Sequence, residues 1–290
     1  MTKTAKAYGK INLSLELTGT LPNGYHGIST VMQSVSLYNT VRVTKNKSGM
    51  ITLSSDDAAL PTDEKNTAFR AAKAFLNAAN LPDDTGLDIF IEKRIPYQAG
   101  MGSASADAAG VLRAANSLFG GVFDDKRLCE IALTIGADVP FCLLGKTMLA
   151  QGIGEKLTPI RDMHDCGLLI LHPNKGMSTP EAYRLFDSLK NPVQPNSAEC
   201  VAAIESGDLE MIAKSCGNVF EQCCTVSEVF DIKARLNELG AMAAVMTGSG
   251  TAVFGIFKTL DDAAAAQKKL NAAEWRSWVA CPVKCGVEIE

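Results

Sequence analysis

Alternation of apolar and polar residues predicts several strands in the first half of the chain. The segments Ala5 to Leu17, Val31 to Val43, Met50 to Leu53 and Leu87 to Glu92 show this alternation, and a period of two is typical of a strand with one buried face. The alanine-rich segment from Thr67 to Ala79 has the composition of a helix. We therefore expect strands and at least one helix in this half.

A glycine-rich segment from Ile95 to Phe119 follows the last of these strands. Gly100 and Gly102 allow a tight turn with positive φ, and Ser103 or Ser105 is expected to cap the helix that comes next. Backbone N–H groups and the positive end of the helix dipole would then converge, which is typical of a phosphate site. An ordinary strand-to-helix connection that uses glycine only for its geometry is the alternative.

Two common nucleotide-binding motifs fit this chain less well. The dinucleotide fingerprint needs a third glycine or an alanine where this chain has Ser105. Gly145-Lys146-Thr147 resembles the end of a Walker A loop, but Pro140 stands where the first glycine of that loop belongs. We expect neither motif to bind a nucleotide here.

Some polar residues lie in segments that are otherwise apolar. Lys10 and Asn12 belong to the first strand, where a lysine is either a solvated edge charge or a cation fixed beside a phosphate or a reacting hydroxyl. Asp138 has apolar neighbours, so we expect a poorly hydrated carboxylate that needs a partner charge, unless it only caps a turn. Tyr25 and His26 share a glycine-flanked turn, which is either an ordinary loop or a platform for a planar heterocycle.

The second half predicts a further α+β unit, with a boundary near residues 155–165. Its expected elements are a strand at 168–171, a helix beginning at 178–181, helices through residue 239, two strands with a glycine turn between them at 243–254, a helix at 260–272 and a closing strand near 279–287. We assign residues 1–158 to the N-terminal domain and residues 159–290 to the C-terminal domain.

Composition excludes several classes of protein. The 290 residues carry a net charge of −4 and no block of Lys and Arg, so neither nucleic acid nor a membrane surface is an expected partner. No apolar run has the length of a membrane span, and the start lacks the features of a signal peptide, so we expect a cytoplasmic protein. The nine cysteines are expected to be reduced and mostly buried. His164 and Cys166 form an isolated pair, and no metal site is expected.

Three motifs along the chain resemble those of the GHMP kinase superfamily: Lys10-Ile11-Asn12-Leu13, GMGSASADAA at 100–109 and TGSGTAVF at 247–254. The segments GYHGISTVMQSV (24–35), GADVPF (136–141) and QGIGEKLTP (151–159) resemble one branch of it, which phosphorylates a cytidine diphosphate ester of methylerythritol in non-mevalonate isoprenoid biosynthesis. The resemblance implies a two-domain α+β fold, with an N-terminal domain of the ribosomal S5 domain 2-like type and a ferredoxin-like C-terminal domain. It also implies transfer of a phosphoryl group from ATP, with Mg²⁺, to the 2-hydroxyl of that ester.

The same resemblance implies roles for individual residues. Asp138 would accept the proton of the substrate hydroxyl, and Lys10 would keep that carboxylate ionised and stabilise the developing charge. The residues implied in ATP binding are Pro96, Gly100, Met101, Gly102, Ser103, Ala104, Ser105 and Ala106. Those implied in substrate binding are Asn12, Tyr25, His26, Tyr183, Gly248, Ser249 and Gly250.

The chain departs from the usual pattern of the superfamily at several positions. Met101, Ser103, Ala104 and Ala106 replace a leucine, two glycines and a serine of the usual loop, while Gly27 and Asn39 stand where Glu and Asp are usual. The added side chains matter only where the backbone needs positive φ or lies against phosphate.

Two other functions stay open at this point. One is another small-molecule kinase of the superfamily, such as a homoserine or mevalonate kinase, and Tyr25-His26 with the GADVPF segment argues against it. The other is a non-catalytic sensor with this fold, and the presence of both Lys10 and Asp138 argues against that function. A phosphotransfer assay separates these classes.

Overall fold

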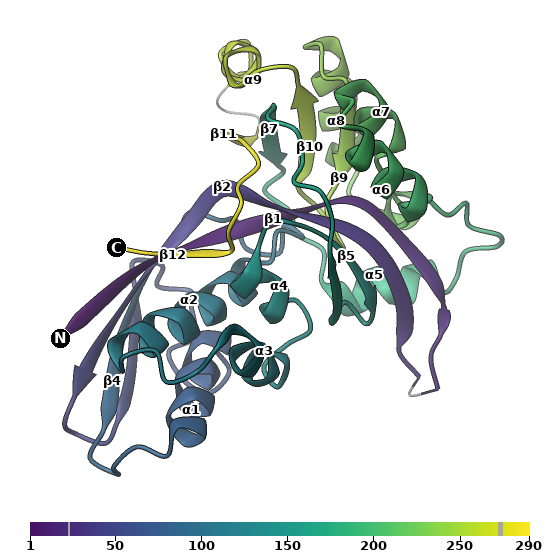
Figure 1. Cartoon of the computed structure of the whole chain (residues 1–290). Coiled ribbons are helices and arrows are strands. Elements are labelled where there is room, and N and C mark those ends of the chain that lie inside the picture. Colours follow the sequence, from purple (N-terminus) through teal and green to yellow (C-terminus); the bar gives the residue numbers. More distant parts are fainter. Residues whose placement is uncertain (23, 272–274) are drawn as a thin grey trace.

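The chain folds into two sheets, each with helices packed against it (Figure 1). The computed structural model describes residues 1–22, 24–271 and 275–290. The strands of the first sheet are β1 (Thr2–Thr20), β2 (His26–Asn46), β3 (Ile51–Ser55), β4 (Gly86–Glu92), β5 (Thr147–Gly152), β6 (Lys156–Pro159), β8 (Gly217–Asn218) and β12 (Val287–Ile289). Its helices are α1 (Thr67–Ala79), α2 (Ser103–Leu118), α3 (Asp125–Leu133) and α4 (Val139–Leu144). The predicted α+β class and the predicted strands of this half are confirmed.

A long antiparallel pair, β1 and β2, crosses the whole molecule (Figure 1). The main path of the sheet runs β12-β1-β2-β4-β3, and β5 extends it from the other half of β2. Three register shifts interrupt the β1–β2 ladder, and such shifts increase the local twist of a strand pair. The two strands can therefore pack against one set of helices at one end and a different set at the other end.

Helix α2 lies close against the sheet because its buried face consists of small residues. Ala106, Ala108 and Ala109 are fully buried. A Cβ atom added at Gly110 would lie 2.9 Å from a methyl group of Val41 and 3.1 Å from the Cβ of Ala7. Close packing of this kind fixes the position of the helix on β1 and β2, and so fixes where its N-terminus points.

The second sheet has the ferredoxin-like arrangement that the superfamily resemblance implied. Its strands are β7 (Gly167–His172), β9 (Ala243–Met246), β10 (Val253–Phe257) and β11 (Arg276–Ala280), in the antiparallel order β11-β7-β10-β9. The helices of this half of the chain are α5 (Thr179–Phe186), α6 (Ser197–Ser206), α7 (Leu209–Ser215), the short 3₁₀ helix η1 (Val219–Cys223), α8 (Glu228–Glu238) and α9 (Leu260–Gln267). Helices α8 and α9 contact this sheet, whereas α6 contacts β1 and β2. Helical crossovers after the first and third strands give the β-α-β-β-α-β order of that fold.

Some predicted elements differ from the structure. The single closing strand near residues 279–287 is wrong: β11 ends at Ala280, and the chain then returns to the first sheet, where β12 pairs with β1. The helix predicted at 260–272 ends at Gln267, and residue 272 lies outside the described residues. Helix α4 was not predicted. The division at residue 158 stays a prediction. In the described part of the chain, no helix combines the length and the apolar character that crossing a bilayer requires.

Candidate active site

One cavity of about 560 Å³ collects most of the residues that the motifs singled out. Its lining comes from β1, β2, the loop before α2, the start of α4, the start of α5 and the turn between β9 and β10. The sequence-predicted residues that line it are Lys10, Asn12, Pro96, Gly100, Met101, Gly102, Ser103, Ala104, Ser105, Asp138, Tyr183, Gly248 and Ser249. Segments more than 200 residues apart in sequence therefore meet in one cavity.

Lys10 places a buried ammonium group between two polar partners. Its side chain is 5% exposed, and its Nζ donates a hydrogen bond of 2.6 Å to Asn12 Oδ1 and lies 3.8 Å from Asp138 Oδ2. Strand β1 brings Lys10 and Asn12 to the same face because they are two residues apart. Asp138, the residue just before α4, adds its carboxylate to this cluster.

The carboxylate of Asp138 is more hydrated than its apolar sequence neighbours suggested. The Asp138 side chain is 34% exposed, so the expected poorly hydrated setting is wrong. Val139 and Phe141 turn into the core as α4 begins, whereas Asp138 precedes the helix and makes no side-chain capping bond. The carboxylate is thus open to the cavity and not occupied by a helix cap.

Asn12 is fixed on every side by hydrogen bonds within the described part of the chain. Its Nδ2 donates to Thr30 Oγ1 at 2.7 Å, and its backbone N–H donates to Thr247 Oγ1 at 2.9 Å. The Thr247 bond joins β1 to the turn after β9, so Asn12 also helps hold the two halves of the cavity together. Because its Oδ1 accepts from Lys10, this network sets the position of the ammonium.

The two glycine turns of the motifs pack directly against each other. A Cβ atom on Gly100 would lie 2.0 Å from Thr247 O, and one on Gly248 would lie 2.7 Å from Gly100 O. Both residues also have positive φ, a region in which other residues are strained. Glycine is therefore required here by geometry and by space, and the contact between these turns forms one wall of the cavity.

The N-terminus of α2 presents free backbone donors to the cavity. The N-cap is Gly102, with φ of 68° and no side-chain capping bond, so the expectation that Ser103 or Ser105 caps the helix is wrong. The first N–H groups of a helix have no partner within it, and the positive end of the helix dipole lies beside them. An anion is the natural ligand for such a site.

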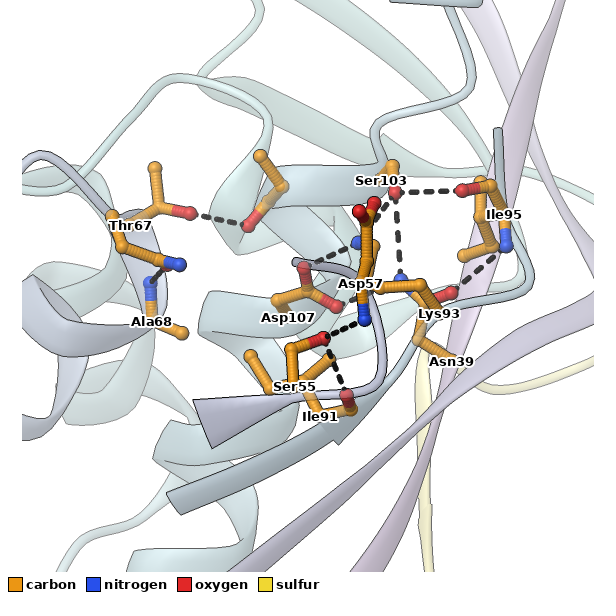
Figure 2. Close-up of polar contacts among 12 residues, drawn as sticks. Asn39, Ser55, Asp57, Thr67, Ala68, Ile91, Lys93, Ile95, Ser103 and Asp107 are labelled. Carbon is orange, nitrogen blue, oxygen red and sulfur yellow. Dashed lines mark hydrogen bonds and ion pairs between the residues drawn. The ribbon is translucent and has the colours of Figure 1, made fainter. Parts of the chain in front are cut away.

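Ser103 is tied into a buried polar network at the start of α2 (Figure 2). Its hydroxyl donates to Ile95 O at 3.1 Å and accepts from Lys93 Nζ at 2.7 Å. The same ammonium group pairs with the Asp107 carboxylate, which is 1% exposed. Burial raises the pKa of the Asp107 carboxyl, while Lys93 and Asn39 act in the opposite direction.

This network explains why Asn39 departs from the usual superfamily pattern. Asn39 Nδ2 donates to Asp107 Oδ1 at 2.7 Å, and Asn39 Oδ1 accepts from the N–H groups of Arg94 and Ile95. A carboxylate at position 39 would face Asp107 with like charge, whereas an amide can donate to it. Ser103 and Ala104 replace glycine inside helix α2, where φ is negative, so neither added Cβ strains the loop.

The sequence reasoning missed this network. In the sequence, Lys93 is an ordinary charged residue after a strand. Asp107 is an ordinary polar residue within a helix. No spacing rule connects residues 93 and 107 before the helix is placed on the sheet. Thr30 was also missed, although it lies inside the GYHGISTVMQSV segment, since a threonine is common in any strand.

Neither Tyr25 nor His26 lines the main cavity. His26 lines a smaller hollow of about 290 Å³ together with Gly19, Thr20 and Asp187. Its ring stacks at 5.0 Å on Tyr183, which does line the main cavity. Burial, together with the nearby Asp138 carboxylate, raises the pKa of Tyr183 to about 12. Tyr183 thus separates the hollow from the Lys10–Asp138 cluster.

The remaining predicted residues fall outside both spaces. Tyr25 is 64% exposed. Ala106 is buried in α2, and Gly250 lies against the side chains of Met246 and Met177. His164 is exposed. All nine cysteines are free thiols, but only three are buried and six are partly exposed, so the expectation that most are buried is wrong. Among the described residues, no group of three or more His, Cys, Asp or Glu side chains could hold a metal ion.

Comparison with known proteins agrees with this geometry. The family model for the GHMP kinase N-terminal domain matches residues 66–146, and the model for the C-terminal domain matches residues 200–276. The chain therefore belongs to the GHMP kinase family.

The narrower assignment depends on individual relatives. The kinase of that name from Clostridium botulinum (strain Loch Maree / Type A3) is 40% identical over 87% of this chain and 90% of its own length. The one from Caldicellulosiruptor saccharolyticus is 41% identical over 92% of each chain. A solved 4-(cytidine 5'-diphospho)-2C-methyl-D-erythritol kinase matches with a TM-score of 0.80 and 31% identity, over 97% of this chain and 99% of that chain. The homoserine kinase of Cytophaga hutchinsonii, 21% identical with a TM-score of 0.78, shares the fold alone. Within the GHMP kinase family, the chain therefore belongs with the 4-diphosphocytidyl-2-C-methyl-D-erythritol kinases.

Proposed function

We propose that the chain transfers the γ-phosphoryl group of ATP to the 2-hydroxyl of 4-diphosphocytidyl-2-C-methyl-D-erythritol, a step of non-mevalonate isoprenoid biosynthesis. The observation that carries the proposal is the cluster of Lys10, Asn12 and Asp138 next to the uncapped N-terminus of α2. A phosphate site and a hydroxyl-activating carboxylate in one cavity are what phosphoryl transfer to an alcohol requires.

The triphosphate of ATP would lie against the N-terminus of α2. The backbone N–H groups of residues 103–105 would be the donors, and Gly100 and Gly102 supply the positive φ that the turn before them requires. A nearly enclosed cation, Lys10, adds positive charge at the end of this site. Together these groups would hold the phosphate chain and stabilise charge that develops on the transferred phosphoryl group.

Asp138 and Lys10 would have different roles at the substrate hydroxyl. Asp138 is open to the cavity and would take the proton from the substrate hydroxyl as that oxygen attacks phosphorus. Lys10 lies 3.8 Å from this carboxylate and would stabilise the negative charge that develops during transfer. The bond from Lys10 to Asn12 keeps the ammonium in place through the reaction.

Magnesium fits this site as an ion that arrives with ATP. No carboxylate cage is seen among the described residues, and Mg²⁺ at nucleotide sites commonly keeps water ligands and binds phosphate oxygens. Ser105 is the serine best placed to add a hydroxyl ligand, because it lines the cavity while the hydroxyl of Ser103 is engaged by Ile95 and Lys93. When bound, the ion would neutralise charge on the phosphates.

The cytosine of the substrate would lie beside His26 and Tyr183. An ester in which the base is far from the reacting hydroxyl needs an extended site, and Tyr183 lines the same cavity as Asp138. Tyr25 and Tyr183 would supply aromatic surface for the base, as stacking is tolerant of base identity. The free thiols of all nine cysteines support a reducing, cytoplasmic setting.

A phosphotransfer assay tests the proposal. The protein is incubated with ATP, Mg²⁺ and the cytidine ester, and ³¹P NMR follows the appearance of a phosphomonoester together with ADP. Homoserine and mevalonate serve as competing acceptors. Phosphorylation of either of these, with the cytidine ester ignored, would overturn the proposed acceptor and leave only the family.

A further inference from the structure

Asn218 links the short strand β8 to the turn between β9 and β10. As the N-cap of η1, its Oδ1 accepts a hydrogen bond from Phe220 N–H at 3.0 Å. Its Nδ2 donates to Met246 O at 2.7 Å and to Gly248 O at 2.8 Å. The residue is 5% exposed. Both N–H donors of the buried amide are therefore used by carbonyl groups of the turn.

Capping alone does not explain an asparagine at this position. An N-cap uses only a side-chain oxygen, and serine, aspartate and asparagine supply it about equally well. Asn196 and Asp208 show two of these choices in this chain, as the N-caps of α6 and α7. An amide at position 218 can accept from Phe220 and also donate twice, whereas a carboxylate cannot donate and a hydroxyl has one donor. The two bonds to the turn are thus the feature that requires asparagine.

The turn held by Asn218 contacts the catalytic cluster. Thr247 Oγ1 accepts the N–H of Asn12 at 2.9 Å, and Asn12 Oδ1 accepts from the Lys10 ammonium at 2.6 Å. Thr247 is fully buried and lies between the two residues whose carbonyl groups Asn218 holds. Because the backbone is fixed on both sides of Thr247, its side chain is fixed as well, and so is the Asn12–Lys10 pair that it contacts.

The same turn contacts the loop that precedes α2. A Cβ atom on Gly248 would lie 2.7 Å from Gly100 O, and Ala252 N–H donates to Ala99 O at 3.2 Å. Movement of the turn would therefore shift the loop before the proposed phosphate site relative to Lys10. Phosphoryl transfer depends mostly on positioning and charge stabilisation, and a displacement of about 1 Å can cost about 10²-fold in rate.

We propose that Asn218 is a positioning residue for phosphoryl transfer. It holds the turn at Thr247 and Gly248 so that the Lys10 cluster and the N-terminus of α2 keep the spacing that the reaction needs. Asn218 does not line the cavity, so it acts through the turn and not on a substrate. The inference rests on the proposed function, because it assumes that the cluster and the helix N-terminus act on one phosphoryl group.

The test replaces the amide with a carboxylate of the same shape. Asn218→Asp can still accept from Phe220 N–H, but it cannot donate and it places negative charge against two carbonyl oxygens. Asn218→Ser also keeps a capping oxygen and has one donor in place of two, so it gives a second test if the first variant folds poorly. Asn196→Asp is the matched control, because Asn196 is an exposed helix N-cap outside the cavity.

Both Asn218 variants are expected to lower kcat about 10- to 100-fold in the phosphotransfer assay, at a temperature where circular dichroism shows them fully folded. The KM values for ATP and for the acceptor should change by less than about threefold, because the groups that bind them are still present. In a double variant with Thr247→Val, the losses should be less than additive, since Asn218 acts through Thr247. A wild-type kcat in both folded variants, with only a lower free energy of unfolding, would overturn the proposal.

Hydrogen exchange followed by mass spectrometry separates this inference from the proposed function. In Asn218→Asp without ligands, peptides containing residues 99–102 and 247–252 should exchange faster than in the wild type. Asn196→Asp should match the wild type in both peptides. Unchanged exchange in Asn218→Asp would overturn the inference whatever the acceptor is, whereas failure of the wild type to phosphorylate the cytidine ester would overturn the proposed function alone.

Discussion

The carboxylate of Asp138 is separated from the Lys10 ammonium by 3.8 Å and carries no helix cap. Asp138→Asn keeps the shape of the side chain but removes its ability to take a proton. We expect kcat to fall by about 10²–10⁴-fold, the usual contribution of a general base, while ATP binding and the unfolding midpoint stay close to wild type. Steady-state kinetics and ATP titration measure both quantities, with Asp125→Asn on the exposed surface of α3 as control. A kcat near the wild-type value would remove Asp138 from the role of base.

Ser103 and Ser105 begin the same helix, yet we expect them to respond differently to alanine. Ser103→Ala removes a hydroxyl that bonds both Ile95 O and Lys93 Nζ, so it should lower the free energy of unfolding by about 1–3 kcal/mol. Ser105→Ala should change stability by less than about 0.5 kcal/mol and instead raise KM for ATP several-fold. Denaturant unfolding and ATP kinetics on both variants check this. A higher KM for ATP in Ser103→Ala, together with lost stability in Ser105→Ala, would show that Ser103 binds the phosphates and Ser105 stabilises the fold.

At the scale of single residues, the sequence predicted which residues form the site better than it predicted what surrounds each of them. Lys10 and Asp138 do lie together, as the motif pattern indicated. Three details were wrong or missing: the exposure of Asp138, the capping by serine and the partners of Lys93. Each depends on how α2 and α4 sit against the sheet, and periodicity carries no information about contacts between elements.

Contact between the two glycine turns is the element-scale feature that closes the cavity. Gly100→Ala would bring a Cβ to 2.0 Å from Thr247 O, so the turns would have to separate. We expect loss of most activity and a drop in unfolding free energy well beyond the roughly 1–2 kcal/mol that positive φ alone costs an alanine. Gly120→Ala is the matched control, because Gly120 has φ of +83° and open space around its Cβ. Equal effects of the two substitutions would mean that only backbone strain matters.

Most elements could be predicted from the sequence, but their ends and partners could not. Strands β1 and β2 run further than the alternating segments indicated, since Gly27 and other small residues are accepted inside a paired ladder. The C-terminal segment shows the limit most clearly. Residues 279–287 read as one strand, but β12 forms only because β1 offers it an edge, and that edge exists only in the folded molecule.

For the molecule as a whole, His172 makes stability depend on pH in the acid range. It is buried in β7, where no hydrogen-bond partner to either ring nitrogen is found in the described structure, and it pairs in register with Arg276. Burial, and to a smaller extent the Arg276 charge, lower the pKa of His172 from 6.5 to about 4. The unfolded chain therefore binds a proton at a pH where the folded chain does not, so this residue costs stability as pH falls below 6.5.

The expected size of the effect follows from the two pKa values. Between pH 7.5 and pH 4, protonation of His172 in the unfolded state should remove about 3 kcal/mol of unfolding free energy. His172→Leu and His172→Gln cannot titrate, so both should lose this part of the acid slope, although their stabilities at pH 7.5 will differ because one is apolar and the other is not. Denaturant unfolding of the three proteins at matched pH values measures the difference, in which contributions from all other groups cancel. A wild-type slope in both variants would mean that His172 is already protonated in the fold or is hydrated there, and that the acid sensitivity of the molecule lies elsewhere.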